Sequence, residues 1–198
     1  MNQSDIGQLL ILVVLLALSA FFSSAETAFT TCNKIYMRTL AQENDPRAAK
    51  VLKVTENSGK MLSAILIGNN VVNLSASSLA TSLAIRVFGS VAAGIATGIL
   101  TLLILIFGEI SPKTIATLRA DKLALRFCHI IWALMTVMTP VIFVVSRLSQ
   151  FFLRLVGVRP GEEVRAMTEE ELRTIVDVGQ ASGVIEDKER DMIHNLFD

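Results

Sequence analysis

The sequence predicts an all-α membrane protein with three transmembrane helices, a cytoplasmic-side helical hairpin, juxtamembrane helices and an acidic helical tail. Three observations lead to this fold class. First, 52% of the 198 residues are apolar and only 18% are charged, which is more apolar surface than a small soluble domain can bury. Second, the first 161 residues carry 14 Lys and Arg against 7 Asp and Glu, whereas the last 37 carry 4 against 11. Third, four runs lack acidic and basic residues apart from His, and each has about the 20 residues that a membrane-crossing helix needs: residues 6–25, 61–85, 87–108 and 127–146.

The first three runs are predicted to cross the membrane, with the N-terminus outside. The first run is preceded by Asp5 and by no basic residue, so a retained helix is favoured over a cleaved signal peptide. Segment 34–60 carries six basic residues against three acidic ones, which places it in the cytoplasm. The short link 86–90 then lies outside, and the third run returns to the cytoplasmic side.

The fourth run conflicts with this charge pattern if it crosses. Arg147, Arg154, Arg159 and the acidic tail would then be outside, against the preference of basic residues for the cytoplasm. Pro140 divides the run near its middle, and proline interrupts helices. We therefore expect two short helices that enter from the cytoplasmic side and return, with a kinked fourth crossing as the alternative.

Shorter helices are predicted outside the membrane. Segment 34–60 has the pattern of amphipathic helices lying along the membrane surface, with a break at residues 44–46. In the tail, Thr168 and Glu171 form a capping box for a helix that continues to about residue 180, and a second helix is expected over residues 187–197. We accordingly divide the chain into a transmembrane domain, residues 1–158, and an acidic helical linker, residues 159–198.

Polar side chains line up near the inner end of the first run. Ser19, Ser23 and Glu26 are spaced i, i+4 and i+7, so a helix places two hydroxyls and one carboxylate on one face. They are candidate ion ligands. The alternative for the serines is that they are small residues that let helices pack closely, and Glu26 could also lie at the membrane interface.

The second run contains three amides within one turn. Asn69 and Asn73 share a helical face, whereas Asn70 points roughly 100° away. Amides are unfavourable in a membrane without partners. They are therefore either ligands for a hard cation or hydrogen-bonding groups between helices.

The third run ends at a carboxylate next to a proline. Glu109 follows 22 uncharged residues, and Pro112 lies three positions further on. Because proline has no N–H, Pro112 leaves the Gly108 carbonyl without its helical partner, free to face a cation or water. A carboxylate beside a broken helix in an apolar span is typical of an ion path. Lys113 is expected to extend to the membrane interface, with neutralisation of an empty Glu109 as the alternative.

Together these residues predict an oxygen-only cation site. Six or so oxygen ligands suit Mg2+, Na+ or Ca2+. No nucleophile lies with a base in a pattern of hydrolytic catalysis, so an enzyme is not expected, and the basic residues lack the interleaved aromatics of a nucleic-acid site. The candidate ligands are Ser19, Ser23, Asn69, Asn73, Gly108 and Glu109, with Glu26, Asn70, Pro112 and Lys113 in supporting positions.

Three motifs in order carry a family resemblance: SAFFSSAETA at residues 19–28, IGNNVVN at 67–73 and GEISPK at 108–113. The chain resembles the transmembrane (DUF21) domain of the CNNM/CorC magnesium transporters. The resemblance implies homodimers with three spans and a cytoplasmic-side hairpin. It also implies that the tail leads into a pair of nucleotide-binding CBS modules, which are absent up to residue 198; either the chain is truncated or nucleotide regulation is absent.

The resemblance further implies export of Mg2+ across the inner membrane coupled to Na+ entry, with Mg2+ as the transported ion and Na+ as the coupling ion. Two other functions remain open. The same site could export another cation, such as Co2+ or a polyamine, or it could serve a non-transporting cation sensor or scaffold. Nucleotide is expected as a partner only through the CBS modules.

Overall fold

A computed structural model describes residues 3–155, 169–184 and 186–195, and every regular element among these residues is a helix. The chain forms two compact units, residues 1–146 and 147–198. The predicted boundary at residues 158 and 159 and the capping residue Thr168 lie outside the described residues.

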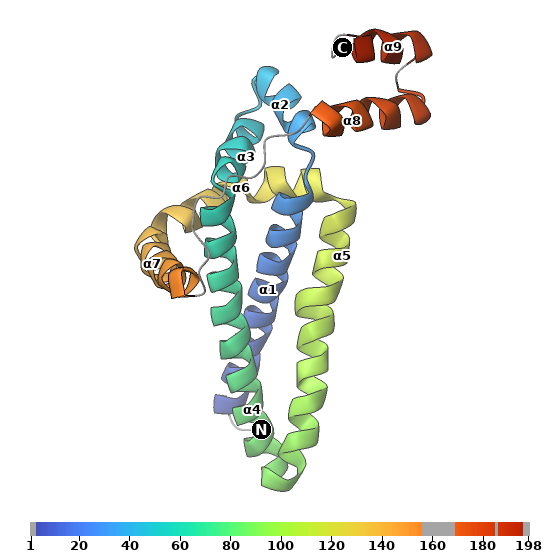
Figure 1. The fold of residues 1–198 in the computed structure, drawn as a ribbon. Helices are drawn as coiled ribbons and strands as arrows, with labels where there is room; N and C mark the ends of the chain where they lie inside the picture. The colour runs from blue at the N-terminus through green and yellow to red at the C-terminus, as the bar shows by residue number, and fades with distance from the viewer. Residues whose placement is uncertain (1–2, 156–168, 185, 196–198) are drawn as a thin grey trace. The chain divides into compact units, whose positions relative to one another are not determined.

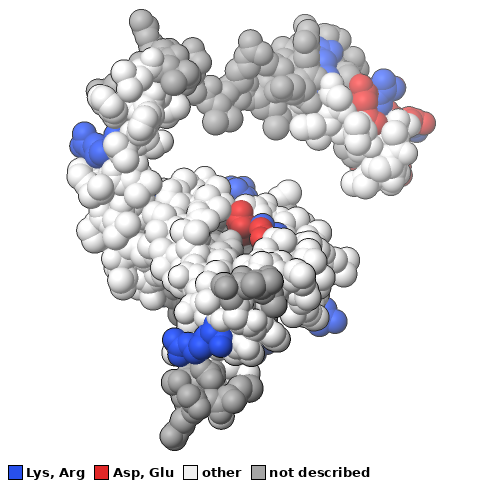
Figure 2. Space-filling view, turned by 90° about the horizontal axis from the view of Figure 1, so that it is seen from below, with Lys and Arg blue, Asp and Glu red and all other residues white. Residues whose placement is uncertain are grey.

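Three helical segments are long and apolar enough to cross a membrane: Ile6–Thr31, Ser58–Gly89 and Gly94–Leu118. They come from α1 (Gln3–Thr31), α4 (Ser58–Ile104), the π-helix η1 (Leu105–Ile110) and α5 (Ser111–Leu118). α1, α4 and α5 run side by side (Figure 1). Seen from the end that carries the N-terminus, the bundle surface is largely uncharged (Figure 2). The three predicted spans are confirmed.

A glycine lies between the second and third of these segments. Gly89 lies inside the range of α4 but has φ 75° and ψ 171°, a conformation that is essentially restricted to glycine. The chain reverses there, which is the position of the link predicted at residues 86–90. A single glycine therefore replaces the short loop expected from the sequence.

The third span is continuous through Pro112, which corrects the prediction of a broken helix. The backbone N–H of Ser111 bonds the carbonyl of Ile106, five residues back. A π-turn of this kind adds a residue to one turn of an α-helix. Pro112 lies in the first turn of α5, where its missing N–H does not end the helix.

Two short helices, α2 (Lys34–Gln42) and α3 (Pro46–Glu56), lie beyond one end of the bundle (Figure 1). The break between them was predicted. Asn44 has a φ of 67°, and the Asp45 side chain caps α3 by accepting the N–H of Arg47. The Arg47 side chain also bonds Asp45, and these bonds hold the pKa of Asp45 below its usual range. Asp45 therefore stays ionised at neutral pH.

The fourth run forms two helices, α6 (Ala120–Val137) and α7 (Thr139–Leu155), bent by 67°. The break at Met138 confirms the predicted division, and Pro140 lies in the first turn of α7, where proline is tolerated. By length and composition the pair fits a broken span or a re-entrant loop. At 67° the two helices diverge and do not lie antiparallel.

The main apolar core lies where α6 packs on α1 and α4 and where α3 packs on α6 and α2. Its largest fully buried members include Phe29, Met37, Met61 and Ile131. A smaller cluster lies further along the bundle, formed by Leu12, Ala76 and Ala80. Ser19 on α1 and Asn73 on α4 fall between these two clusters, whereas Ser23 and Asn69 lie among residues of the main core.

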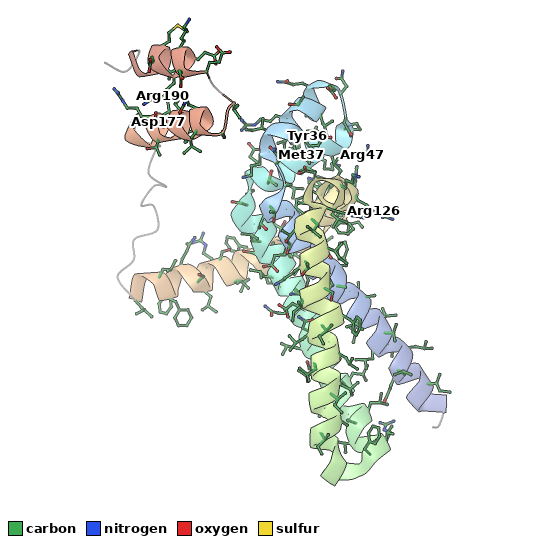
Figure 3. All side chains as sticks on the ribbon, turned by 90° about the vertical axis from the view of Figure 1, so that its right-hand side faces the viewer. Tyr36, Met37, Arg47, Arg126, Asp177 and Arg190 are labelled. Carbon is green, nitrogen blue, oxygen red and sulfur yellow. The ribbon has the colours of Figure 1, made fainter. Side chains whose placement is uncertain are left out.

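The second unit contains the tail helices α8 (Glu169–Ala181) and α9 (Asp187–Asn195). Gly183, with a φ of 75°, lies in the turn between them. The Arg190 Nε donates to the Asp177 Oδ1 at 2.7 Å and joins the two helices (Figure 3). Both predicted tail helices are present in the described residues.

Candidate functional site

Three spans meet at the hydroxyl of Ser19. This side chain has no exposed surface. Its Oγ lies 2.6 Å from the Oδ1 of Asn73 on α4 and 3.2 Å from the carbonyl oxygen of Gly108 in η1. The hydroxyl has one hydrogen, so it donates to one of these two oxygens at a time. The structure thus brings together three of the predicted ligands from three segments far apart in sequence.

The two asparagines of the shared face extend this group of oxygens along α4. The Nδ2 of Asn73 donates to the Oδ1 of Asn69 at 3.4 Å, and Asn69 is buried. Asn70 is exposed, as its position on the helix predicts. The amide of Asn73 is oriented by its partners, with its oxygen toward Ser19 and its nitrogen toward Asn69.

Ser23 presents a buried hydroxyl without a hydrogen-bond partner in the described structure. The side chain has no exposed surface, and its Oγ neither donates nor accepts a hydrogen bond. Leaving a buried polar group unpaired costs roughly 1–3 kcal/mol. An oxygen in this state, one turn from Ser19, has lone pairs available for a cation.

Glycines allow the helices to approach closely around these oxygens. A Cβ on Gly108 would lie 2.9 Å from the Ser19 Oγ and 3.1 Å from Leu16. A Cβ on Gly68 would lie 2.7 Å from the ring of Phe22. The distances to Ser19 and Phe22 are shorter than real Cβ contacts. A side chain at either glycine position would therefore force the neighbouring group to shift.

Two features of the site were not predicted. One is the π-turn of η1, which presents the Gly108 carbonyl to Ser19 without interrupting the span. The other is Ser24, whose Oγ donates to the carbonyl of Pro112 at 3.4 Å. Pro112 indicates that backbone carbonyls near this point lack their usual helical N–H partners. The sequence alone does not show which side chain donates a hydrogen bond to them.

The charged residues form a separate group next to the oxygens. The Nζ of Lys113 lies 3.2 Å from the Oε1 of Glu109 and 3.5 Å from the Oε2 of Glu26. All three side chains are partly buried, with exposed fractions of 25–37%. Lys113 therefore forms ion pairs with both carboxylates and leaves the group with one net negative charge, whereas the alternative considered from the sequence paired it with Glu109 alone. The Glu109 carboxylate pairs with this ammonium, whereas the Gly108 carbonyl beside it in sequence contacts Ser19.

The arrangement provides neutral oxygens in one cluster and carboxylates in the next. The first cluster contains one hydroxyl, two amide oxygens and one backbone carbonyl, with the Ser23 hydroxyl one turn away on α1, and these are the ligand types of hard cations. The second is a pair of carboxylates that already holds an ammonium group. Binding a cation is the chemistry that such groups can perform.

Comparison with known proteins agrees with the membrane architecture. The Cyclin M transmembrane N-terminal domain family (CNNM) matches residues 10–189. A UPF0053 protein of Haemophilus influenzae is 37% identical over 174 residues, which cover 87% of this chain and 41% of that protein. The UPF0053 inner membrane protein YfjD of Escherichia coli is 34% identical over 182 residues, or 91% of this chain and 42% of that protein.

A more distant relative carries a name that describes transport. The polyamine export protein of Haemophilus influenzae is 27% identical over 203 residues, which cover 96% of this chain and 47% of that protein. The chain thus spans less than half the length of these relatives. Since the family match covers nearly the whole chain, this protein belongs to the CNNM family and corresponds to its transmembrane N-terminal domain.

Proposed function

We propose that this chain is the ion-binding transmembrane domain of a Na+-coupled Mg2+ exporter of the inner membrane. The observation that carries the proposal is the convergence of Ser19, Asn73 and the Gly108 carbonyl from three spans. The inner-membrane location is supported by the name of the relative YfjD. The N-terminus is placed outside and the C-terminus in the cytoplasm because segment 34–60 is basic.

The spacing of the three oxygens fits neighbouring ligands of Mg2+. In an octahedral site with Mg–O distances of about 2.1 Å, adjacent oxygens lie about 3 Å apart. The distances from the Ser19 Oγ, 2.6 Å to Asn73 and 3.2 Å to Gly108, lie on either side of that value. Mg2+ entry would require the hydroxyl to turn its hydrogen away and present a lone pair, with Ser23 and Asn69 completing the set.

Coupling to Na+ follows from the charge of the cargo. Moving a divalent cation out of a cell with a negative interior costs about 4.6 kcal/mol per 100 mV. Entry of at least two Na+ ions for each Mg2+ would cancel this charge. Glu26 and Glu109 are the carboxylates beside the oxygen cluster, and Na+ at Glu109 would displace the Lys113 ammonium that occupies this position here.

The direct test is Mg2+ efflux from proteoliposomes loaded with a magnesium-sensitive dye, with and without an opposing Na+ gradient. We expect efflux that requires Na+ and falls at least about tenfold in Asn73→Ala and Glu109→Ala, since each variant removes an oxygen ligand or a charge. Asn70→Ala is the matched control, because Asn70 is exposed and should leave the rate unchanged. Wild-type rates in both site variants would contradict the proposal. Bound Mg2+ without any efflux would favour the non-transporting sensor.

A second candidate is export of a polyamine. Two observations favour it: a relative is named polyamine export protein, and the carboxylates of Glu26 and Glu109 bind a primary ammonium, that of Lys113. Efflux of radiolabelled spermidine from the same proteoliposomes separates the candidates. Spermidine efflux that is unaffected by Asn73→Ala and abolished by Glu109→Gln would support the polyamine, and absence of Mg2+ efflux from the same proteoliposomes would exclude Mg2+ as the cargo.

A further inference from the structure

Basic side chains gather around a hollow between α3 and α6, away from the ion site. The hollow has a volume of about 540 Å³ and is lined by Arg47 from α3 and by Lys122, Leu125, Arg126 and His129 from α6. Arg47 and Arg126 lie on the same side of the molecule, where α3 meets α6 (Figure 3). The volume is within the range of small-molecule sites.

The position of these charges follows from the amphipathic pattern of α6. One face of the helix is buried in the main core through Ala120, Ala124, Cys128 and Ile131. Lys122, Arg126 and His129 are spaced i, i+4 and i+7, and all are exposed. They therefore form one row on the outer face, and α3 places Arg47 beside this row.

The hollow carries net positive charge after its acidic neighbour is counted. Asp45 pairs with Arg47, with the Arg47 Nη2 3.0 Å from the Asp45 Oδ2. Asp121, the acidic residue on α6, accepts the backbone N–H of Asn33 at 2.8 Å. Asp121 keeps its charge in this hydrogen bond, so Arg47, Lys122 and Arg126 against Asp45 and Asp121 leave one net positive charge at the hollow. An anion is the ligand that this charge would bind.

The hollow also lies at the level where the spans end. α6, which supplies Lys122, Arg126 and His129, begins at Ala120, two residues after the span Gly94–Leu118 ends. Trp132 lies one turn beyond His129, is partly exposed, and has the Nζ of Lys50 4.5 Å from its ring centre. Tryptophan beside basic residues is typical of the boundary between hydrocarbon and lipid headgroups.

We propose that this hollow binds the phosphate of an anionic phospholipid. Arg47, Lys122 and Arg126 would contact the phosphate, while the exposed apolar residues Ile130 and Trp132 contact the acyl chains. Basic pockets at the membrane surface recognise acidic headgroups in this way. The inference does not depend on which cation the spans carry.

The test uses Trp132, which is the only tryptophan in the chain. Phospholipids with brominated acyl chains quench tryptophan fluorescence on contact. Purified protein in mixed micelles is titrated with brominated phosphatidylglycerol or brominated phosphatidylcholine. We expect quenching at a several-fold lower mole fraction of the anionic lipid. In Lys122→Gln/Arg126→Gln this preference should disappear, because each basic residue near the surface contributes up to about fivefold.

The matched control removes two charges from a different hollow. Arg38 and Lys53 line a separate depression between α2 and α3, and Arg38→Gln/Lys53→Gln should keep the lipid preference. Equal losses in the two double variants would show attraction to general surface charge and overturn the proposal. Loss of the preference on adding millimolar inorganic phosphate would identify free phosphate as the ligand and also overturn it. Equal quenching by the two lipids in the wild-type protein would also overturn the proposal.

Discussion

Ser19 and Ser23 show that two identical residues one helical turn apart can have different roles. Both are fully buried, and both lie on the face of α1 that was predicted to carry ligands. Ser19 bonds to Asn73 and Gly108 and so connects three segments. Ser23 bonds to nothing in the described structure through its hydroxyl. Ser19 therefore joins the helices through its hydrogen bonds, whereas packing gives no reason for the hydroxyl of Ser23.

This difference predicts opposite effects of two alanine substitutions. Ser23→Ala should leave the stability of the ion-free protein unchanged or raise it by about 1 kcal/mol, because it removes an unpaired buried hydroxyl. The same substitution should reduce the rise in Tm that Mg2+ produces. The measurement is thermal unfolding in detergent with and without Mg2+.

Ser19→Ala is the comparison for this experiment. It removes the hydrogen bond to Asn73 or Gly108 and should destabilise the ion-free protein by about 1 kcal/mol, in addition to weakening the effect of Mg2+. An unchanged Mg2+ response in Ser23→Ala would remove Ser23 from the ligand set.

Among the helices, η1 determines the geometry of the site. Its π-turn carries the third span through Pro112 and directs the Gly108 carbonyl toward α1. The absence of a side chain at Gly108 lets the two helices approach closely enough for this contact. The shape of one turn therefore decides whether the third span contributes an oxygen.

Gly108→Ala tests this close approach. The added Cβ would meet the Ser19 Oγ at 2.9 Å, and relief of such overpacking typically costs about 1–3 kcal/mol. We expect a lower Tm in detergent and a loss of the Mg2+-dependent rise in Tm. Gly98→Ala is the matched control in the same span, since a Cβ there meets nothing within 4 Å. If the two variants have the same Tm and the same Mg2+ response, the close packing at Gly108 has no functional role.

Across the bundle, one lysine connects α1 to the third span. Lys113 in α5 lies between Glu26 of α1 and Glu109 of η1, so one cation pairs with two carboxylates from different helices and leaves one net negative charge. Charges inside a bundle of spans are unfavourable without such partners. The ammonium group therefore stabilises the packing of the spans when no ion is bound.

Removing this ammonium should make the protein dependent on an external cation. In Lys113→Met we expect a lower Tm at low salt and a steeper rise of Tm with Na+ than in the wild-type protein, because Na+ can supply the missing charge. The double variant Lys113→Met/Glu26→Gln should recover part of the loss, since it has one unpaired carboxylate fewer. A Tm and a Na+ dependence equal to those of the wild-type protein would show that Lys113 is dispensable.

Local sequence patterns were sufficient for the helices and for the types of residue at the site. Runs of uncharged residues predicted the three spans, Gly89 lies in the predicted link, and residues 43–45 separate α2 from α3, one residue from the break predicted at 44–46. These features depend on hydropathy and backbone preferences over a few residues, which can be read without knowing the fold. The same patterns identified hydroxyl, amide and carboxylate groups inside the spans as candidate ligands.

Only the packing of the helices decided which of these groups meet. Ser19 contacts Asn73 and Gly108 across 54 and 89 residues of sequence, and Lys113 reaches Glu26 as well as Glu109. The π-turn at Leu105–Ile110 and the unpaired hydroxyl of Ser23 also went unpredicted. Each depends on how one helix is rotated and shifted against another. That geometry is determined by the close contacts of Gly68, Gly108 and the core residues around them, because small residues set how near two helix backbones can come.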